Sequence, residues 1–156
     1  MDLLSLFLCS IPFWAPVAIG LYLVVNKPNE LSLMAGLLTL KPIVTTPIWF
    51  AIISTLPRPV DKLEPAHLWS ILPGASLTLL LAFTFRRLLS GPGAGGARVL
   101  LALDCVRWLN SFLLFLPYGG NAADGSLACL FAVIGLILPT AFAMVALTTS
   151  LTHIGE

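Results

Sequence analysis

Residues 126–150 read SLACLFAVIGLILPTAFAMVALTTS, a stretch of 25 positions without a charged side chain. A helix needs about 20 predominantly apolar residues to cross the hydrocarbon core of a bilayer. This stretch therefore predicts a transmembrane helix, and it sets the pattern against which the rest of the chain can be compared.

Four further apolar runs precede it, at about 3–25, 31–56, 68–85 and 98–117. Their Leu, Ile, Phe and Ala residues follow one another continuously and do not alternate with polar residues as the strands of a membrane barrel do. We therefore expect an all-α integral membrane protein, a single domain over residues 1–156 built as a bundle of five transmembrane helices. The run 68–85 is short, so four spans plus a re-entrant third segment is the alternative.

The composition agrees with a membrane protein. The 156 residues are 58% hydrophobic and only 10% charged, whereas soluble domains are about 45–50% apolar and about 25% charged. This excludes a soluble globular domain, a disordered chain and a secreted disulfide scaffold. The net charge of +1 argues against a nucleic-acid partner and against a strongly polybasic lipid-binding surface. The first partner that the sequence predicts is the lipid bilayer.

The basic residues of the short connections indicate an orientation. With five spans, one side of the membrane carries four of them and the other side carries two. The first set is Lys27, Arg86, Arg87 and Arg98, and the second is Arg58 and Lys62. Because cytoplasmic loops are enriched in Lys and Arg, we expect a multi-pass protein with its N-terminus outside and its C-terminus inside.

The sequence carries no recognisable catalytic or metal-binding motif. His67 opens the third run and His153 follows the fifth, so five spans would place them on opposite faces. No HExxH, GxSxG or paired-carboxylate arrangement is present, and the three cysteines lack CxxC spacing. We therefore expect no catalytic residue, no metal ligand and no cofactor, with an intramembrane enzyme acting on a lipid or quinone as a remaining alternative.

The fourth run is unusually polar for a membrane span because it contains Asp104, Arg107, Asn110 and Ser111. Its eleven Leu, Val and Phe residues favour insertion by roughly 3 to 7 kcal/mol, while Asp and Arg near the centre oppose it by roughly 5 to 7 kcal/mol. Asp104 and Arg107 are three positions apart and can pair on one helix face. The run should therefore face protein with its charges paired.

Lys41 in the second run completes this buried polar cluster. At 1.5 Å per residue it lies roughly 15 Å beyond Leu31, while Asp104 and Arg107 lie roughly 9 and 14 Å beyond Arg98. Because an unpaired charge at that depth is costly, we predict that Asp104 accepts a charged hydrogen bond from Arg107, Lys41 or both. Pro42 and Pro47 predict a kinked, locally polar stretch, which lines a cavity in some transporters and is an ordinary packing device elsewhere.

The fifth run carries small residues at steps of three or four, a pattern that lets membrane helices approach closely. The members of this helix-packing stripe are Ala128, Ala132, Gly135, Pro139, Ala143, Ala146 and Ser150. The partner helix could belong to this chain or to another one.

Two functional hypotheses follow. The first is a non-catalytic structural or accessory subunit of a larger membrane complex, which supports other membrane subunits or further copies of itself through helix packing. The absence of catalytic motifs and of soluble domains favours it. The second is a small transporter or channel with the polar cluster of spans 2 and 4 on an anion or proton path, because an intramembrane ionisable residue is by default a candidate functional residue.

Overall fold

The computed structural model describes residues 2–26, 29–55, 68–113 and 122–152, except the side chains at 53, 111 and 122–128. These residues form helices and contain no strand. In chain order the elements are α1 (Leu3–Asn26), α2 (Glu30–Ser54), the 3₁₀-helix η1 (Trp69–Ile71), α4 (Leu72–Thr84), α5 (Arg86–Ser90), α6 (Gly95–Leu113) and α7 (Ala122–Thr152).

Three of the described helices are long and apolar enough to cross a membrane. They are α1, residues Glu30–Ile52 of α2, and residues Cys129–Thr152 of α7. Residues Trp69–Thr84 form a further apolar helix of shorter length. Helix α6, which holds the described part of the fourth predicted span, is not in this set, and it contains Arg98, Asp104 and Arg107. The described residues thus form an all-helical, membrane-embedded bundle with three candidate membrane-spanning helices.

The helix boundaries differ most from expectation around the third and fourth runs. The run 68–85 is divided into η1 and α4, and a break at Phe85 separates them from α5. Phe85 leaves the helical region with φ −100° and ψ 24°. The fourth run was expected to begin at about residue 98, but α6 already begins at Gly95. Gly93 makes the turn with φ 78°, a conformation that glycine adopts without steric cost.

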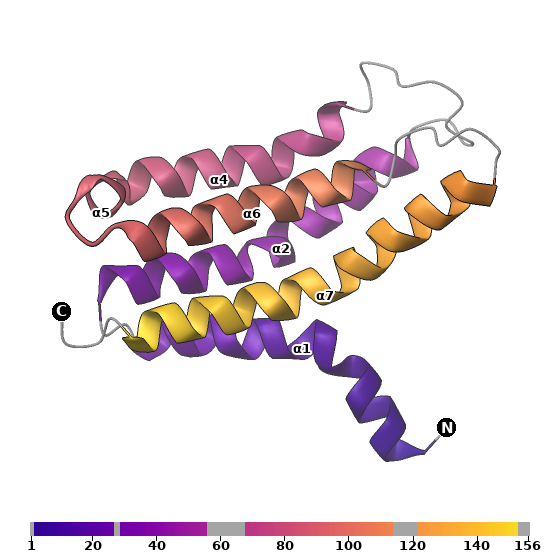
Figure 1. Ribbon diagram of the computed structural model, residues 1–156, viewed down its shortest axis with the longest axis horizontal. Helices are drawn as coiled ribbons and strands as arrows, with labels where there is room; N and C mark the ends of the chain where they lie inside the picture. Colours follow the sequence, from indigo (N-terminus) through magenta and orange to yellow (C-terminus); the bar gives the residue numbers. More distant parts are fainter. Residues whose placement is uncertain (1, 27–28, 56–67, 114–121, 153–156) are drawn as a thin grey trace.

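Helix α1 begins at a local cap and bends in its middle. The Asp2 carboxylate accepts the Ser5 backbone N–H at 2.8 Å, and hydrogen bonds from the Ser5 side chain and backbone lower the pKa of Asp2. Pro12 and Pro16 lie inside the helix, and each removes a backbone donor and disturbs the preceding turn. In Figure 1 the N-terminal half of α1 projects away from the bundle, while its second half lies along α7 and α2.

Helix α2 lies at the centre of the packing, where Met34, Ala35 and Leu38 have no exposed surface. Its contact with α1 passes through two glycines. A Cβ atom added at Gly36 would lie 2.9 Å from the Gly20 carbonyl oxygen and 3.0 Å from the Val24 nitrogen. The two backbones are therefore as close as glycine allows, which is how helices gain van der Waals contact in lipid.

Candidate functional site: a buried ion cluster beside a pocket

The Lys41 ammonium group of α2 lies inside the bundle, where its residue is 6% exposed. It donates hydrogen bonds to Asp104 Oδ2 of α6 at 2.7 Å, to Thr78 Oγ1 of α4 at 2.8 Å, and to the Gly74 carbonyl oxygen of α4 at 3.1 Å. An ammonium group has three donor hydrogens, so all three have an acceptor from this chain. Lys41 thereby joins three helices.

Asp104 is fully buried and accepts on both of its carboxylate oxygens. Oδ2 receives Lys41 and the Thr78 hydroxyl, and Oδ1 receives Arg107 Nη2 at 2.6 Å. The ion pair of Asp104 with Arg107 joins residues three apart on α6, as the sequence spacing predicted. The ion pair of Asp104 with Lys41 joins residues that are 63 positions apart in the chain. The predicted hydrogen bonds to both cations are therefore present.

Arg107 connects α6 to two further helices. Its Nη2 also donates to the Leu38 carbonyl oxygen of α2. Leu38 lies four residues before Pro42, which has no backbone N–H to give to that carbonyl, so the guanidinium supplies the missing donor. The guanidinium carbon lies 3.7 Å from the centre of the Phe142 ring of α7, a cation–π contact that is strengthened when desolvated.

Asn110, one turn further along α6, is also buried and contacts α7. Its Nδ2 donates to the Phe131 carbonyl oxygen at 3.2 Å. A Cβ atom added at Gly135 would lie 3.2 Å from this same nitrogen, so Gly135 leaves the room that the Asn110 amide occupies. The fifth member of the predicted cluster, Ser111, has a side chain outside the described set.

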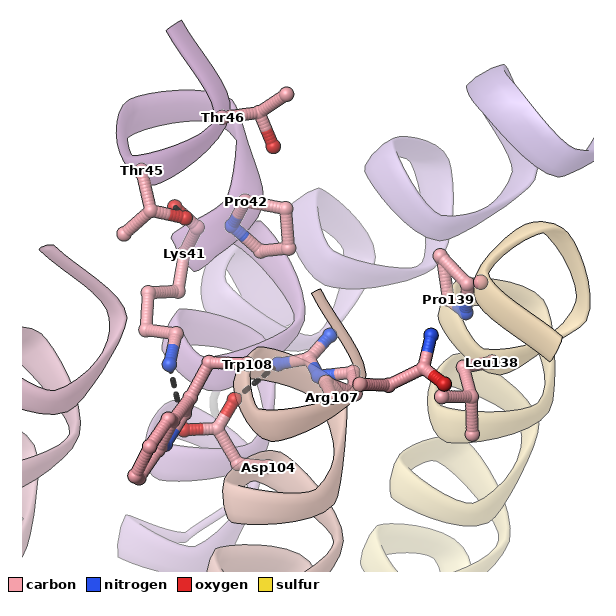
Figure 2. Close-up of a pocket in the computed structure, with 11 residues that line it drawn as sticks. Lys41, Pro42, Thr45, Thr46, Asp104, Arg107, Trp108, Leu138 and Pro139 are labelled. Carbon is pink, nitrogen blue, oxygen red and sulfur yellow. Dashed lines mark hydrogen bonds and ion pairs between the residues drawn. The ribbon is translucent and has the colours of Figure 1, made fainter. Parts of the chain in front are cut away.

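A pocket of about 170 Å³ lies beside the ion cluster, between α2, α6 and α7. Figure 2 shows Lys41 and Arg107 on either side of the Asp104 carboxylate. Pro42, Thr45 and Thr46 lie above Lys41 in this view, and Pro139 lies across from Arg107. The lining residues are Lys41, Pro42, Thr45, Thr46, Asp104, Arg107, Trp108, Asn110, Gly135, Leu138 and Pro139. The pocket therefore lies where two proline-containing helices face the charged side of α6.

The comparisons with known proteins add nothing to this geometry. No family model matches the chain, and no curated protein or solved structure shows significant similarity to it. Its function must therefore be inferred from the site itself. Within the described residues, no group of three or more His, Cys, Asp or Glu side chains is arranged to hold a metal ion. His67 and His153 lie outside the described residues.

The small-residue stripe of α7 is buried over only part of its length. Ala143, Ala146 and Ser150 are at most 1% exposed, and Gly135 and Pro139 are half-buried. Ala132, in contrast, is exposed, so no described helix of this chain covers it. The side chain of Ala128 is outside the described set. Because α7 contains Pro139 and bends (Figure 1), its two halves do not keep one common packed face.

Four partners of the cluster were missed from the sequence: Thr78, the Gly74 carbonyl, the Leu38 carbonyl and Phe142. A threonine, a glycine and a phenylalanine in apolar helices give no signal of contact with a charge. The structure gives the reason for a glycine at position 74, since a Cβ atom there would lie 2.6 Å from the Trp108 Cβ. Leu38 could have been found from Pro42, because proline frees the carbonyl four residues earlier.

Proposed function

We propose that this chain is a non-catalytic subunit of a larger membrane protein complex, and that its ion cluster holds its own helices in the arrangement that neighbouring subunits contact. The observation that carries this proposal is the internal pairing of the cluster. All three hydrogens of the Lys41 ammonium and both oxygens of Asp104 are engaged by groups of this chain.

The physical argument concerns how helices associate in a bilayer. Lipid tails are as apolar as leucine, so helix association depends on close packing and interhelical hydrogen bonds. The cluster links α2 to α4 and α6 through Lys41, and α6 to α7 through Arg107 and Phe142. A charge that is fully paired by its own chain supports a structural role more directly than a role in carrying a solute.

The outer surface of the bundle is suited to apolar neighbours. Leu3, Phe7 and Phe13 of the projecting half of α1 are 85%, 54% and 70% exposed. A scaffold subunit would present such helix faces to lipid, to other membrane subunits, or to a second copy of itself. The finer topology that belongs to this proposal has five spans, with the N-terminus outside and the C-terminus inside the membrane.

The test is purification from the native membrane in a gentle detergent, followed by mass spectrometry of the co-purifying proteins. A fixed set of membrane proteins that is recovered in constant ratio, and that is lost with Asp104→Leu, would support the proposal. The exposed variant Leu136→Ala on α7 should leave recovery unchanged. Purification of the chain as a monomer without partners would contradict it.

The pocket favours a second candidate, a small transporter or channel. Thr45, Thr46 and Asn110 add hydroxyl and amide groups to the wall that Lys41 and Arg107 form, and broken or kinked helices line the solute sites of many transporters. Liposomes that contain the purified protein separate the two candidates. Anion or proton flux above that of protein-free liposomes, abolished by Thr46→Val in a folded protein, would favour transport. A scaffold gives no such flux.

A further inference from the structure

We infer that the Arg86–Arg87 end of the bundle is a binding site for the phosphate of an anionic phospholipid. A pocket of about 330 Å³ opens there between the start of α2 and the break that separates α4 from α5. It is lined by Glu30, Leu33, Thr84, Phe85, Arg86 and Arg87. This site is separate from the ion cluster and goes beyond the proposed scaffold role.

The position of the pocket along the bundle is that of a membrane interface. Leu79, Leu80 and Phe83 on the last turns of α4 are 71%, 58% and 66% exposed, so this part of the helix presents apolar side chains outward. The two arginines follow directly. In Figure 1 α5, the start of α2 and the end of α7 lie at the same end of the molecule. The surface thus changes from apolar to basic where acyl chains give way to headgroups.

Arg86 and Arg87 differ in the contacts that their side chains make within the chain. Arg86 stacks on Phe83, with its guanidinium carbon 4.5 Å from the ring centre, and donates to the Phe83 carbonyl oxygen at 3.2 Å. Arg87 is exposed and forms no ion pair with any residue that the structure describes. Its guanidinium can therefore give two parallel hydrogen bonds to a phosphate, a geometry that arginine matches and lysine does not.

The charge at this pocket is positive even with its acidic residue counted. Arg86 and Arg87 contribute two positive charges and Glu30 one negative charge. The net charge of the whole chain is only +1, so this local excess of positive charge is not apparent from the composition. The exposed apolar side chains on the preceding turns of α4 favour a phospholipid over free phosphate, because Leu79, Leu80 and Phe83 can contact acyl chains while the arginines hold the headgroup.

The experiment is a titration of the purified full chain, in phosphatidylcholine nanodiscs, with increasing phosphatidylglycerol. Native mass spectrometry would count bound lipids, and a thermal melt would report stability. A basic residue near an anionic surface contributes about 1 kcal/mol, so Arg87→Gln should weaken phosphatidylglycerol retention about fivefold. Arg98→Gln is the matched control, because it removes one charge at the same end while Arg98 bonds the Leu89 carbonyl outside the pocket.

The outcomes are distinct. Preferential retention of phosphatidylglycerol that falls with Arg87→Gln, is restored only in part by Arg87→Lys and is unchanged by Arg98→Gln would support the site. Equal loss in both glutamine variants would overturn it, since the effect would then be that of net charge. An equal stabilisation by inorganic phosphate in phosphatidylcholine nanodiscs would also overturn the assignment to lipid. Equal retention of phosphatidylcholine and phosphatidylglycerol by the wild-type protein would also overturn the site.

Discussion

Asp104 is the residue on which the buried charges depend, because among the described residues its carboxylate pairs with both Lys41 and Arg107. Removing one member of a buried ion pair costs about 3–5 kcal/mol, since it leaves a charge without compensation. Asp104→Leu should therefore lower the free energy of unfolding by about that amount or prevent folding. Unfolding in mixed micelles followed by circular dichroism measures this loss.

The control for that substitution is Glu30→Gln, which neutralises an exposed acid with no ion pair among the described residues. A triple variant with Lys41→Met, Asp104→Leu and Arg107→Met should recover much of the lost stability, because apolar replacement of a whole buried ion cluster is often neutral or favourable. If Asp104→Leu is no more destabilising than Glu30→Gln, the structural role of the cluster is wrong.

Thr78 provides a second test at the level of one side chain. Its hydroxyl contacts both Lys41 and Asp104, and hydrogen bonds to charged groups contribute about 1.5–3 kcal/mol. Thr78→Val should cost a similar amount, while Thr78→Ser should retain most of the stability. Thr84→Val on the same helix is the control, because Thr84 is exposed and its hydroxyl, within the described part of the chain, bonds the Leu80 carbonyl and no ion. Comparable losses at both threonines would show that the contact with the ions is unimportant.

At the scale of helices, the pairing of α1 with α2 depends on the absence of a side chain at Gly36. A methyl group there would meet backbone atoms of Gly20 and Val24, which cannot move without separating the helices. Overpacking of this kind costs about 1–3 kcal/mol, so Gly36→Ala should lower the thermal midpoint measurably. Gly95→Ala should have no such effect, because a Cβ atom at Gly95 has no neighbour within 4 Å. The idea fails if both glycines tolerate alanine equally.

The prolines act on the same scale by freeing carbonyl groups. Pro42 leaves the Leu38 carbonyl without its usual helical donor, and Arg107 of another helix bonds it. Pro139 likewise leaves the Gly135 carbonyl without its usual helical donor. Gly135 lines the pocket beside Asn110. Kinks that look like weaknesses in single helices thus provide polar groups for contacts between helices.

At the scale of the whole molecule, the number of spans can be tested at the two chain ends. Five spans place the N-terminus and the C-terminus on opposite sides of the membrane, whereas four spans plus a re-entrant third segment place them on the same side. We expect opposite sides. Protease protection of N-terminal and C-terminal epitope tags in oriented membrane vesicles measures this directly, and protection of both tags in the same vesicles would refute the five-span topology.

The sequence by itself determined the class of the protein and indicated that Asp104 pairs with Arg107, Lys41 or both. The apolar runs in residues 3–25, 31–56 and 126–150 are long enough to cross a bilayer, so composition and length are sufficient to indicate a membrane-embedded protein. The three-residue spacing of Asp104 and Arg107 and the depth of Lys41 were also sufficient, because an isolated charge at that depth is too costly to leave unpaired.

Only the tertiary structure decided which groups complete the cluster and where the chain is closely packed. Thr78, Phe142 and the Leu38 carbonyl reach the charges because α4, α7 and α2 lie against α6, and no local pattern encodes such crossings. For the same reason, the stripe on α7 did not reveal that Ala132 is exposed. The sequence likewise did not show that Gly20 and Gly36 form the close contact of α1 with α2. Helix periodicity specifies which residues share a face, whereas the kinks and the neighbouring helices decide which part of that face is covered.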